Sequence, residues 1–95
     1  MKVRELKNFL SLSQNEAQTL KTMTAISHWA KRLHDDVEYA TFQPKEIEML
    51  RKLVDMKVVE VVRQEAGQVP TVHAKLNESG EELYRDFFAL GYYGV

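Results

Sequence analysis

The apolar positions at the start of the chain recur at helical spacing. Three of them lie three or four residues apart and predict a first helix over residues 2–12: Val3, Leu6 and Leu10. Ser13 follows at a position where an N-cap is expected, and Glu16 stands three residues later, as in a capping box. A second helix is therefore expected to begin directly after Ser13.

No proline or glycine interrupts residues 15–34. The apolar and small residues of this stretch again recur at helical steps: Ala17, Leu20, Met23, Ser27, Ala30 and Leu33. The stretch is compatible with one long helix. It is equally compatible with two helices that break near residues 22–24, where a threonine could serve as a cap.

A third helix is expected after an acidic, irregular connection at residues 34–41. Gln43 stands at a cap position and Pro44 at the first helical position, where its missing N–H is harmless. Glu46 follows at the third position, where a capping box has an acid. The helix is expected to run to about Met56, with one buried stripe: Ile47, Leu50, Leu53 and Val54.

The next segment has the pattern of a β-hairpin. Residues 58–62 are dense in valine, and residues 71–76 alternate between apolar and polar side chains, so both are predicted strands. Gly67 supplies conformational freedom for the turn between them. In the second strand the residues expected to face the core are Val72, Ala74 and Leu76, and those expected to face water are Thr71, His73 and Lys75.

A last helix completes the prediction. Asn77 or Ser79 is expected to cap it, and Gly91 is expected to end it in the left-handed conformation. Its core positions are expected to be Leu83, Phe87 and Leu90. A tail of residues 92–95 follows.

Composition limits the chain to one domain over residues 1–95. The apolar fraction of 44% and the charged fraction of 28% are ordinary for a globular protein. No apolar run approaches the ~20 residues of a membrane span, and the N-terminus does not resemble a signal peptide. Cysteine is absent, which excludes disulfides and thiolate metal sites. We therefore expect a cytoplasmic protein without a membrane partner.

Charge is unevenly distributed although the net charge is only −1. Residues 1–33 carry +4 and residues 43–77 carry +1, whereas residues 34–42 and 78–95 carry −3 each. The chain is therefore not a polybasic nucleic-acid binder, but one basic sector could still face phosphates.

Three segments resemble winged-helix regulators. Residues 76–83, Leu-Asn-Glu-Ser-Gly-Glu-Glu-Leu, resemble the passage from the second wing strand into the following helix. Residues 47–59 resemble a recognition helix that runs into the first wing strand. Residues 25–33 look like the second helix of the PadR-like and MarR-like groups. The resemblance covers about three quarters of the chain and implies an α+β winged-helix fold with three N-terminal helices, a β-hairpin wing and a C-terminal helix.

One position departs from the family pattern. Winged-helix regulators usually have glycine between the recognition helix and the first wing strand, where the backbone adopts a positive φ. This sequence has Lys57 there. Either the helix ends differently, or Lys57 accepts a backbone conformation that costs about 1 kcal/mol.

The resemblance implies a small regulator or accessory factor that binds double-stranded DNA. The recognition helix, at about residues 44–56, would enter the major groove, and the wing, at about residues 58–76, would touch the adjacent backbone. The side chains implied as DNA contacts are Lys45, Glu48, Arg51, Lys52, Arg63, Gln64, Gln68 and Lys75.

The sequence also suggests a homodimer. Five of its aromatic residues fall within the last twelve positions, which is more than one short helix is expected to bury, and aromatic residues are enriched in interfaces. The residues expected at a dimer interface are Leu6, Phe9, Leu10, Tyr84, Phe88, Tyr92 and Tyr93. The alternative is that Phe87 is core and the tyrosines are merely exposed.

Catalysis has little support, so no enzyme, cofactor or metal site is expected. His28, His34 and His73 stand at no metal-ligand spacing, and no nucleophile motif or phosphate-binding loop is present. The rival to DNA binding is a winged helix that docks onto another protein. The near-neutral charge and the acids of the third helix favour this rival, and an assembly subunit that acts through the C-terminal aromatics is a third possibility.

Overall fold

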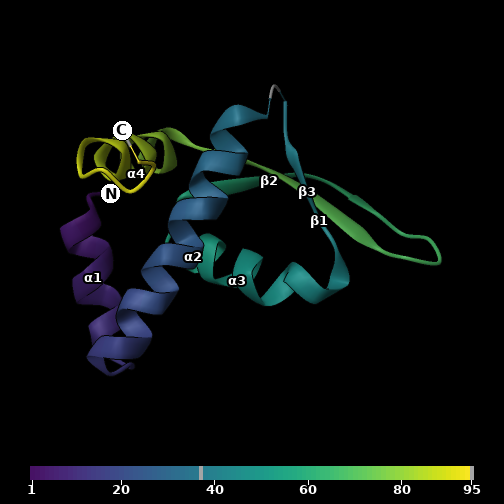
Figure 1. Cartoon of the computed structure of the whole chain (residues 1–95). Coiled ribbons are helices and arrows are strands. Elements are labelled where there is room, and N and C mark those ends of the chain that lie inside the picture. The colour runs from purple at the N-terminus through teal and green to yellow at the C-terminus, as the bar shows by residue number, and fades with distance from the viewer. Residues whose placement is uncertain (37, 95) are drawn as a thin grey trace.

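A computed structural model describes residues 1–36 and 38–94 as an α+β fold (Figure 1). Its elements are α1 (Val3–Ser11), α2 (Glu16–Asp35), β1 (Ala40–Phe42), the 3-10 helix η1 (Pro44–Glu46), α3 (Ile47–Asp55), β2 (Val59–Glu65), β3 (Thr71–Leu76) and α4 (Glu78–Ala89). The three strands form one antiparallel sheet in the order β1-β3-β2. This layout is compatible with a winged helix. None of the described helices is both long enough and apolar enough to span a lipid bilayer.

The second helix is continuous. Asn15 caps it, because its side chain accepts a hydrogen bond of 2.8 Å from the backbone N–H of Gln18; the predicted cap at Ser13 was wrong. The threonines at residues 22–24 do not break the helix. The hydroxyl of Thr24 instead donates to the carbonyl of Leu20 one turn earlier, a bond that a threonine inside a helix can make.

The predicted connection at residues 34–41 contains a strand. Residues 40–42 form β1, which pairs with β3 in the register Ala40↔Ala74 and Phe42↔Val72. Only three residues long, β1 takes its conformation from this pairing rather than from a local pattern. Val37, in the predicted connection, and Val95, in the predicted tail, lie outside the described residues.

The start of the third helix was predicted correctly. Pro44 opens η1, and Glu46 accepts a hydrogen bond of 3.0 Å from the backbone N–H of Gln43. The first turn is a 3-10 turn that leads directly into α3. On the preceding strand, the ring of Phe42 is fully buried and stacks on Trp29 of α2 with centroids 4.2 Å apart.

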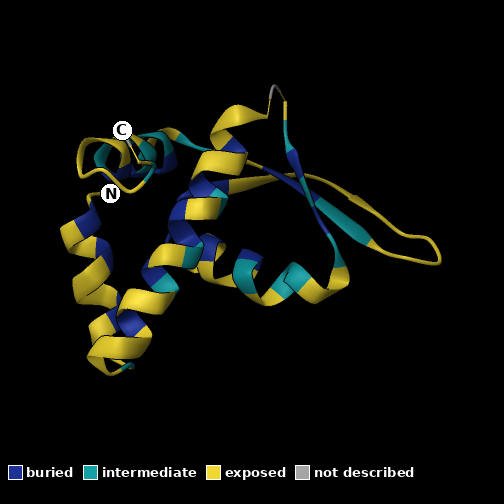
Figure 2. Cartoon of the chain, in the orientation of Figure 1, coloured by how far each residue is buried: buried dark blue, intermediate teal, exposed yellow. Residues whose placement is uncertain are grey.

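The core lies where the four α-helices meet the base of the sheet, whereas the distal half of the hairpin is exposed (Figure 2). Its fully buried large side chains come from every α-helix and from β1: Leu6, Ile26, Phe42, Leu53, Leu83 and Phe87. Leu90 was predicted in this core but is 60% exposed, because α4 ends at Ala89 and Leu90 is its C-cap. Val54 was also predicted in the core stripe of α3 and is exposed.

His73 was predicted to face water and is buried, with only 6% of its surface exposed. Its Nδ1 lies 3.0 Å from the hydroxyl of Thr41 on β1, and the ring of Tyr39 packs edge-on against it. The alternation of β3 does point His73 away from Ala74, as expected. The prediction failed because the side chains of Thr41 and Tyr39 contact His73 on that face of the sheet.

The α-helices α3 and α4 are each followed by a residue in the left-handed backbone conformation. Gly91 ends α4 as predicted, with φ +81° and hydrogen bonds from its own N–H to Phe88 and from the next residue to Phe87. Lys57 ends α3 with φ +58°. Its N–H donates to the carbonyl of Val54, and the N–H of residue 58 donates to residue 53, which is the hydrogen-bond pattern of a Schellman motif.

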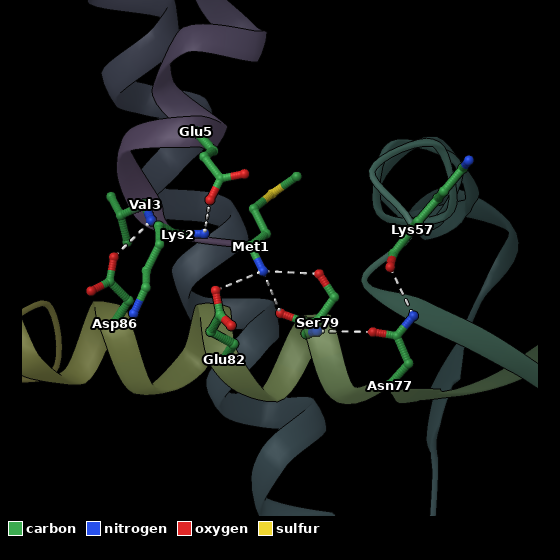
Figure 3. A network of polar contacts seen from close by, with 10 residues as sticks. Met1, Lys2, Val3, Glu5, Lys57, Asn77, Ser79, Glu82 and Asp86 are labelled. Carbon is green, nitrogen blue, oxygen red and sulfur yellow. Dashed lines mark hydrogen bonds and ion pairs between the residues drawn. The ribbon is translucent and has the colours of Figure 1, made fainter.

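The base of the hairpin is tied to α4 by one side chain (Figure 3). Asn77 Nδ2 donates to the carbonyl of Lys57 at 2.7 Å, and Asn77 Oδ1 accepts from the N–H of Gly80 at 2.9 Å. A Cβ built at Gly80 would lie 2.1 Å from the carbonyl oxygen of Val58, so the two backbones meet where only glycine fits.

The first helix is held against α4 by polar contacts at its start (Figure 3). The amine of Met1 donates to Ser79 Oγ at 2.9 Å and lies 3.1 Å from the carboxylate of Glu82. Asp86 accepts a hydrogen bond of 2.7 Å from the backbone N–H of Val3. A carboxylate of α4 thus satisfies one of the free N–H groups at the positive end of α1.

Candidate interaction face

The residues implied as DNA contacts are all exposed, but they do not lie on one surface. Lys45 lies in η1, Glu48, Arg51 and Lys52 on α3, Arg63 and Gln64 on β2, Gln68 in the turn, and Lys75 on β3. The side chains of Val72 and Gln64 lie toward α3, where they line a common groove. Lys75 points to the opposite face of the sheet, because it is three positions from Val72 along β3.

A break in register places Arg63 on that opposite face as well. Val61 pairs with Ala74 and Arg63 with His73, so Val62 is an extra residue, as in a β-bulge. The guanidinium of Arg63 lies 3.3 Å from the hydroxyl of Tyr39, beside the buried His73. Arg63 and Lys75 therefore lie on one face of the sheet and Gln64 on the other.

Several of these cations are already neutralised by neighbouring acids. Three ion pairs involve these residues: Arg51 with Glu48 at 3.2 Å on α3, and, on the opposite face of the sheet, Arg63 with Glu65 at 2.9 Å and Lys75 with Glu60 at 3.1 Å. Exposed pairs of this kind contribute little stability. Each one nevertheless places a carboxylate beside the cation that would meet a phosphate. In the described part of the chain, Lys45, Lys52 and Lys57 form no ion pair.

An apolar groove runs between α3 and the hairpin. Ile47, Leu50 and Val72 line it, and Val54 and Val61 form its rim with 42% and 44% of their surfaces exposed. Toward the turn it widens into a depression of about 490 Å³ between Pro44 and Pro70, with Glu48 and Glu65 beside it. The groove was not predicted from the sequence. The available signal was the pair of adjacent valines in β2, because neighbouring side chains of a regular strand point to opposite faces of the sheet and so cannot both face the core.

The helices before the groove do not form a short helix-turn-helix. In that motif the two helices are joined by a turn of about three or four residues. Here residues 36–43 separate α2 from η1 and include the strand β1. Between β1 and β2 lie the 3-10 helix η1 and a single α-helix, α3.

The residues predicted at a dimer interface have mixed placements. Leu6 and Leu10 are buried in the core of the chain itself, so they are not surface residues. Phe9, Phe88 and Tyr92 are exposed. Tyr84 and Tyr93 are half-buried.

Much of the aromatic surplus is accommodated within the chain. The ring of Tyr84 stacks on His34 with centroids 3.8 Å apart and on Tyr93 with centroids 5.3 Å apart. The hydroxyl of Tyr93 donates to the carbonyl of Ser27 at 2.9 Å, and burial raises the pKa of this hydroxyl. The C-terminal aromatics thus pack the tail onto α2 and α4.

The histidines do not assemble a metal centre. His34 pairs with Glu81 of α4 at 2.8 Å. His73 has a buried Nε2 without a hydrogen-bond partner, 3.6 Å from the carboxylate of Glu65. Over residues 1–36 and 38–94, no group of three or more histidine, cysteine, aspartate or glutamate side chains could hold a metal ion.

Comparisons of the chain with protein-family models, with curated proteins and with solved structures found no match. The assignment of function therefore rests on the face formed by α3 and the hairpin.

Proposed function

We propose that the protein is a small winged-helix-like interaction module that binds a protein segment in the groove between α3 and the hairpin. The observation that carries the proposal is the apolar rim of the groove, where Val54 and Val61 remain nearly half exposed. Contiguous exposed apolar surface beside a groove is typical of protein-binding sites. Burying the rest of a half-exposed valine contributes about 1 kcal/mol, so the two together contribute usefully to binding.

The charge of the face supports a protein partner over DNA. A phosphate backbone is bound by cations, and each acid beside a cation opposes that binding. Glu48 lies on the exposed face of α3 and is paired with Arg51. The pairing of Arg63 and Lys75 with acids on the far side of the sheet leaves few cations directed toward a common duplex.

DNA binding by the same face is the second candidate. Its support is the winged-helix-like order of the elements together with three lysines outside any described ion pair, Lys45, Lys52 and Lys57. Three phosphate contacts would give a shallow dependence of affinity on salt, unless a dimer doubled them.

The test uses a library of displayed peptides selected on the protein, with binding then mapped by NMR. Selected peptides are expected to shift the amide signals of Ile47 and Val72, and Val54→Asp and Val61→Asp are expected to abolish binding. Val69→Asp, at an exposed valine in the turn outside the groove, is the matched control and is expected to bind as the parent does. Selected peptides whose binding is indifferent to both groove substitutions would contradict the proposal.

A second arm measures binding to mixed-sequence duplex DNA at two salt concentrations, with Arg51→Ala and Lys52→Ala beside the parent. The proposed function predicts no measurable binding at low salt, where non-specific contacts are strongest. Binding that weakens with salt and with both substitutions would instead establish the DNA candidate.

A further inference from the structure

The strand β2 forms an edge of the sheet with one side unpaired. The sheet order is β1-β3-β2, so within the described residues β2 pairs only with β3. It is seven residues long, and every residue from Glu60 to Glu65 is exposed. A strand of this kind presents a row of free N–H and C=O groups that can accept a further strand.

The side chains of this edge are unusually apolar at its centre. Val61 and Val62 are 44% and 48% exposed, between the charged residues Glu60 and Arg63. Val54 of α3 lies beside Val61 on the rim of the groove. An added strand would therefore cover apolar side chains as well as pair with backbone groups.

The sequence of β2 is complementary to itself when two copies run antiparallel. With a two-fold axis between Val61 and Val62, each Glu60 stands opposite Arg63 of the second copy. Val61 then stands opposite Val62, so the axis is flanked by two apolar pairs and, beyond them, by two pairs of opposite charge. Opposite charges and β-branched pairs across strands both stabilise a sheet.

The break in register fits this arrangement. It lies at Val62, between the regular stretches 59–61 and 63–65. In the two-fold pairing residues 59–61 of one copy face residues 62–64 of the other. The extra residue Val62 thus lies next to the axis in both copies, opposite Val61 of the other copy.

We propose that a second copy of this chain is the partner of the face, docked by antiparallel pairing of the two β2 edges into a six-stranded sheet. The inference rests on the proposed function and deepens it by naming the partner. Inward side chains of the added strand would lie over the rim formed by Val54 and Val61. The test must distinguish this dimer from two alternatives. In one, the partner is a peptide from another protein, and in the other the chain dimerises through Phe88 and Tyr92.

The test is sedimentation velocity over a range of micromolar concentrations, with a charge swap across the axis. The parent is expected to dimerise. Glu60→Arg and Arg63→Glu alone each place like charges opposite one another at both symmetry-related positions, so each is expected to weaken the dimer by about ten-fold or more. The double variant restores opposite charges and is expected to recover the parent affinity.

The swap separates dimerisation from folding. Each single variant also breaks an intrachain pair, Glu60 with Lys75 or Arg63 with Glu65, and the double variant leaves both broken. Recovery in the double variant therefore reports contacts between copies, while circular dichroism checks the fold of all four proteins. Phe88→Ser, at an exposed aromatic, is expected to leave the dimer unchanged.

A parent that stays monomeric at high micromolar concentration would overturn the inference and leave the peptide selection as an independent test of the proposed function. Failure of the double variant to recover would also overturn it, as would loss of the dimer in Phe88→Ser. In that last case the C-terminal aromatics form the interface.

Discussion

Replacing Lys57 by glycine should stabilise the protein. Lys57 adopts φ +58°, a conformation that costs an L-residue with a Cβ about 1–2 kcal/mol. Glycine removes this cost but adds about 0.5–1 kcal/mol of backbone entropy to the unfolded chain. The Lys57 side chain is exposed and forms no described ion pair, so little else is lost. The net gain is about 0.5–1 kcal/mol.

Urea unfolding followed by circular dichroism measures this gain in free energy. In thermal unfolding the same gain corresponds to a melting temperature about 4 °C higher for a domain of this size. Two variants control for the chemistry of the substitution. Lys57→Ala keeps the Cβ at the strained position and is expected to change the free energy of unfolding little. Lys52→Gly makes the same replacement inside α3, where glycine is expected to cost about 1 kcal/mol.

The reasoning would be refuted by a Lys57→Gly variant no more stable than the parent. It would also fail if Lys57→Ala gained as much as Lys57→Gly, because the gain would then come from losing the lysine side chain rather than from relieving the backbone.

Three further predictions follow from the packing. Gly80→Ala should lower the free energy of unfolding by about 2–3 kcal/mol, because its Cβ would meet the carbonyl of Val58. A melting temperature equal to the parent's in a thermal scan would contradict this. Asn77→Ala should lose about 2 kcal/mol in urea unfolding, since it removes a helix cap and a second hydrogen bond. Burial raises the pKa of Tyr93, so the unfolded chain loses this proton first and stability should fall as pH rises above 10.0. Tyr93→Phe should reduce that alkaline loss and Tyr92→Phe should not.

Elements with strong local signals were predictable from the sequence. Gln43 and Glu46 form the expected capping interaction, and Gly91 ends α4 with a positive φ. At Lys57 the structure has the positive φ that was one of the two outcomes the sequence left open. In each case residues adjacent in the chain decide the conformation.

Features decided by distant residues were not predictable. β1 is a strand because β3 lies beside it, and His73 is buried because Tyr39 and Thr41 cover it. Three residues are too few to show a periodicity that would predict β1. The alternation along β3 could not predict the burial of His73, because the residues that contact it come from another part of the chain.

The candidate site shows the same limit. The charged residues of α3 and the hairpin could be listed from the sequence, but the acid that pairs with each one could not. The extra residue at Val62 is also invisible in the sequence, yet it decides that Arg63 leaves the groove side of the sheet while Val61 and Gln64 remain on it. A pattern of polar positions therefore overestimated the number of cations that could act together.

The bond network of Asn77 has a consequence for how the molecule opens. Its backbone N–H donates to Val58, and its side chain holds the end of α3 and the start of α4. Breaking the base of the hairpin removes the cap of α4 in the same event. Amide protons near Val59, Leu76 and Gly80 should therefore exchange with solvent at similar free energies, as one cooperative unit, while those at the tip of the hairpin exchange earlier by local opening.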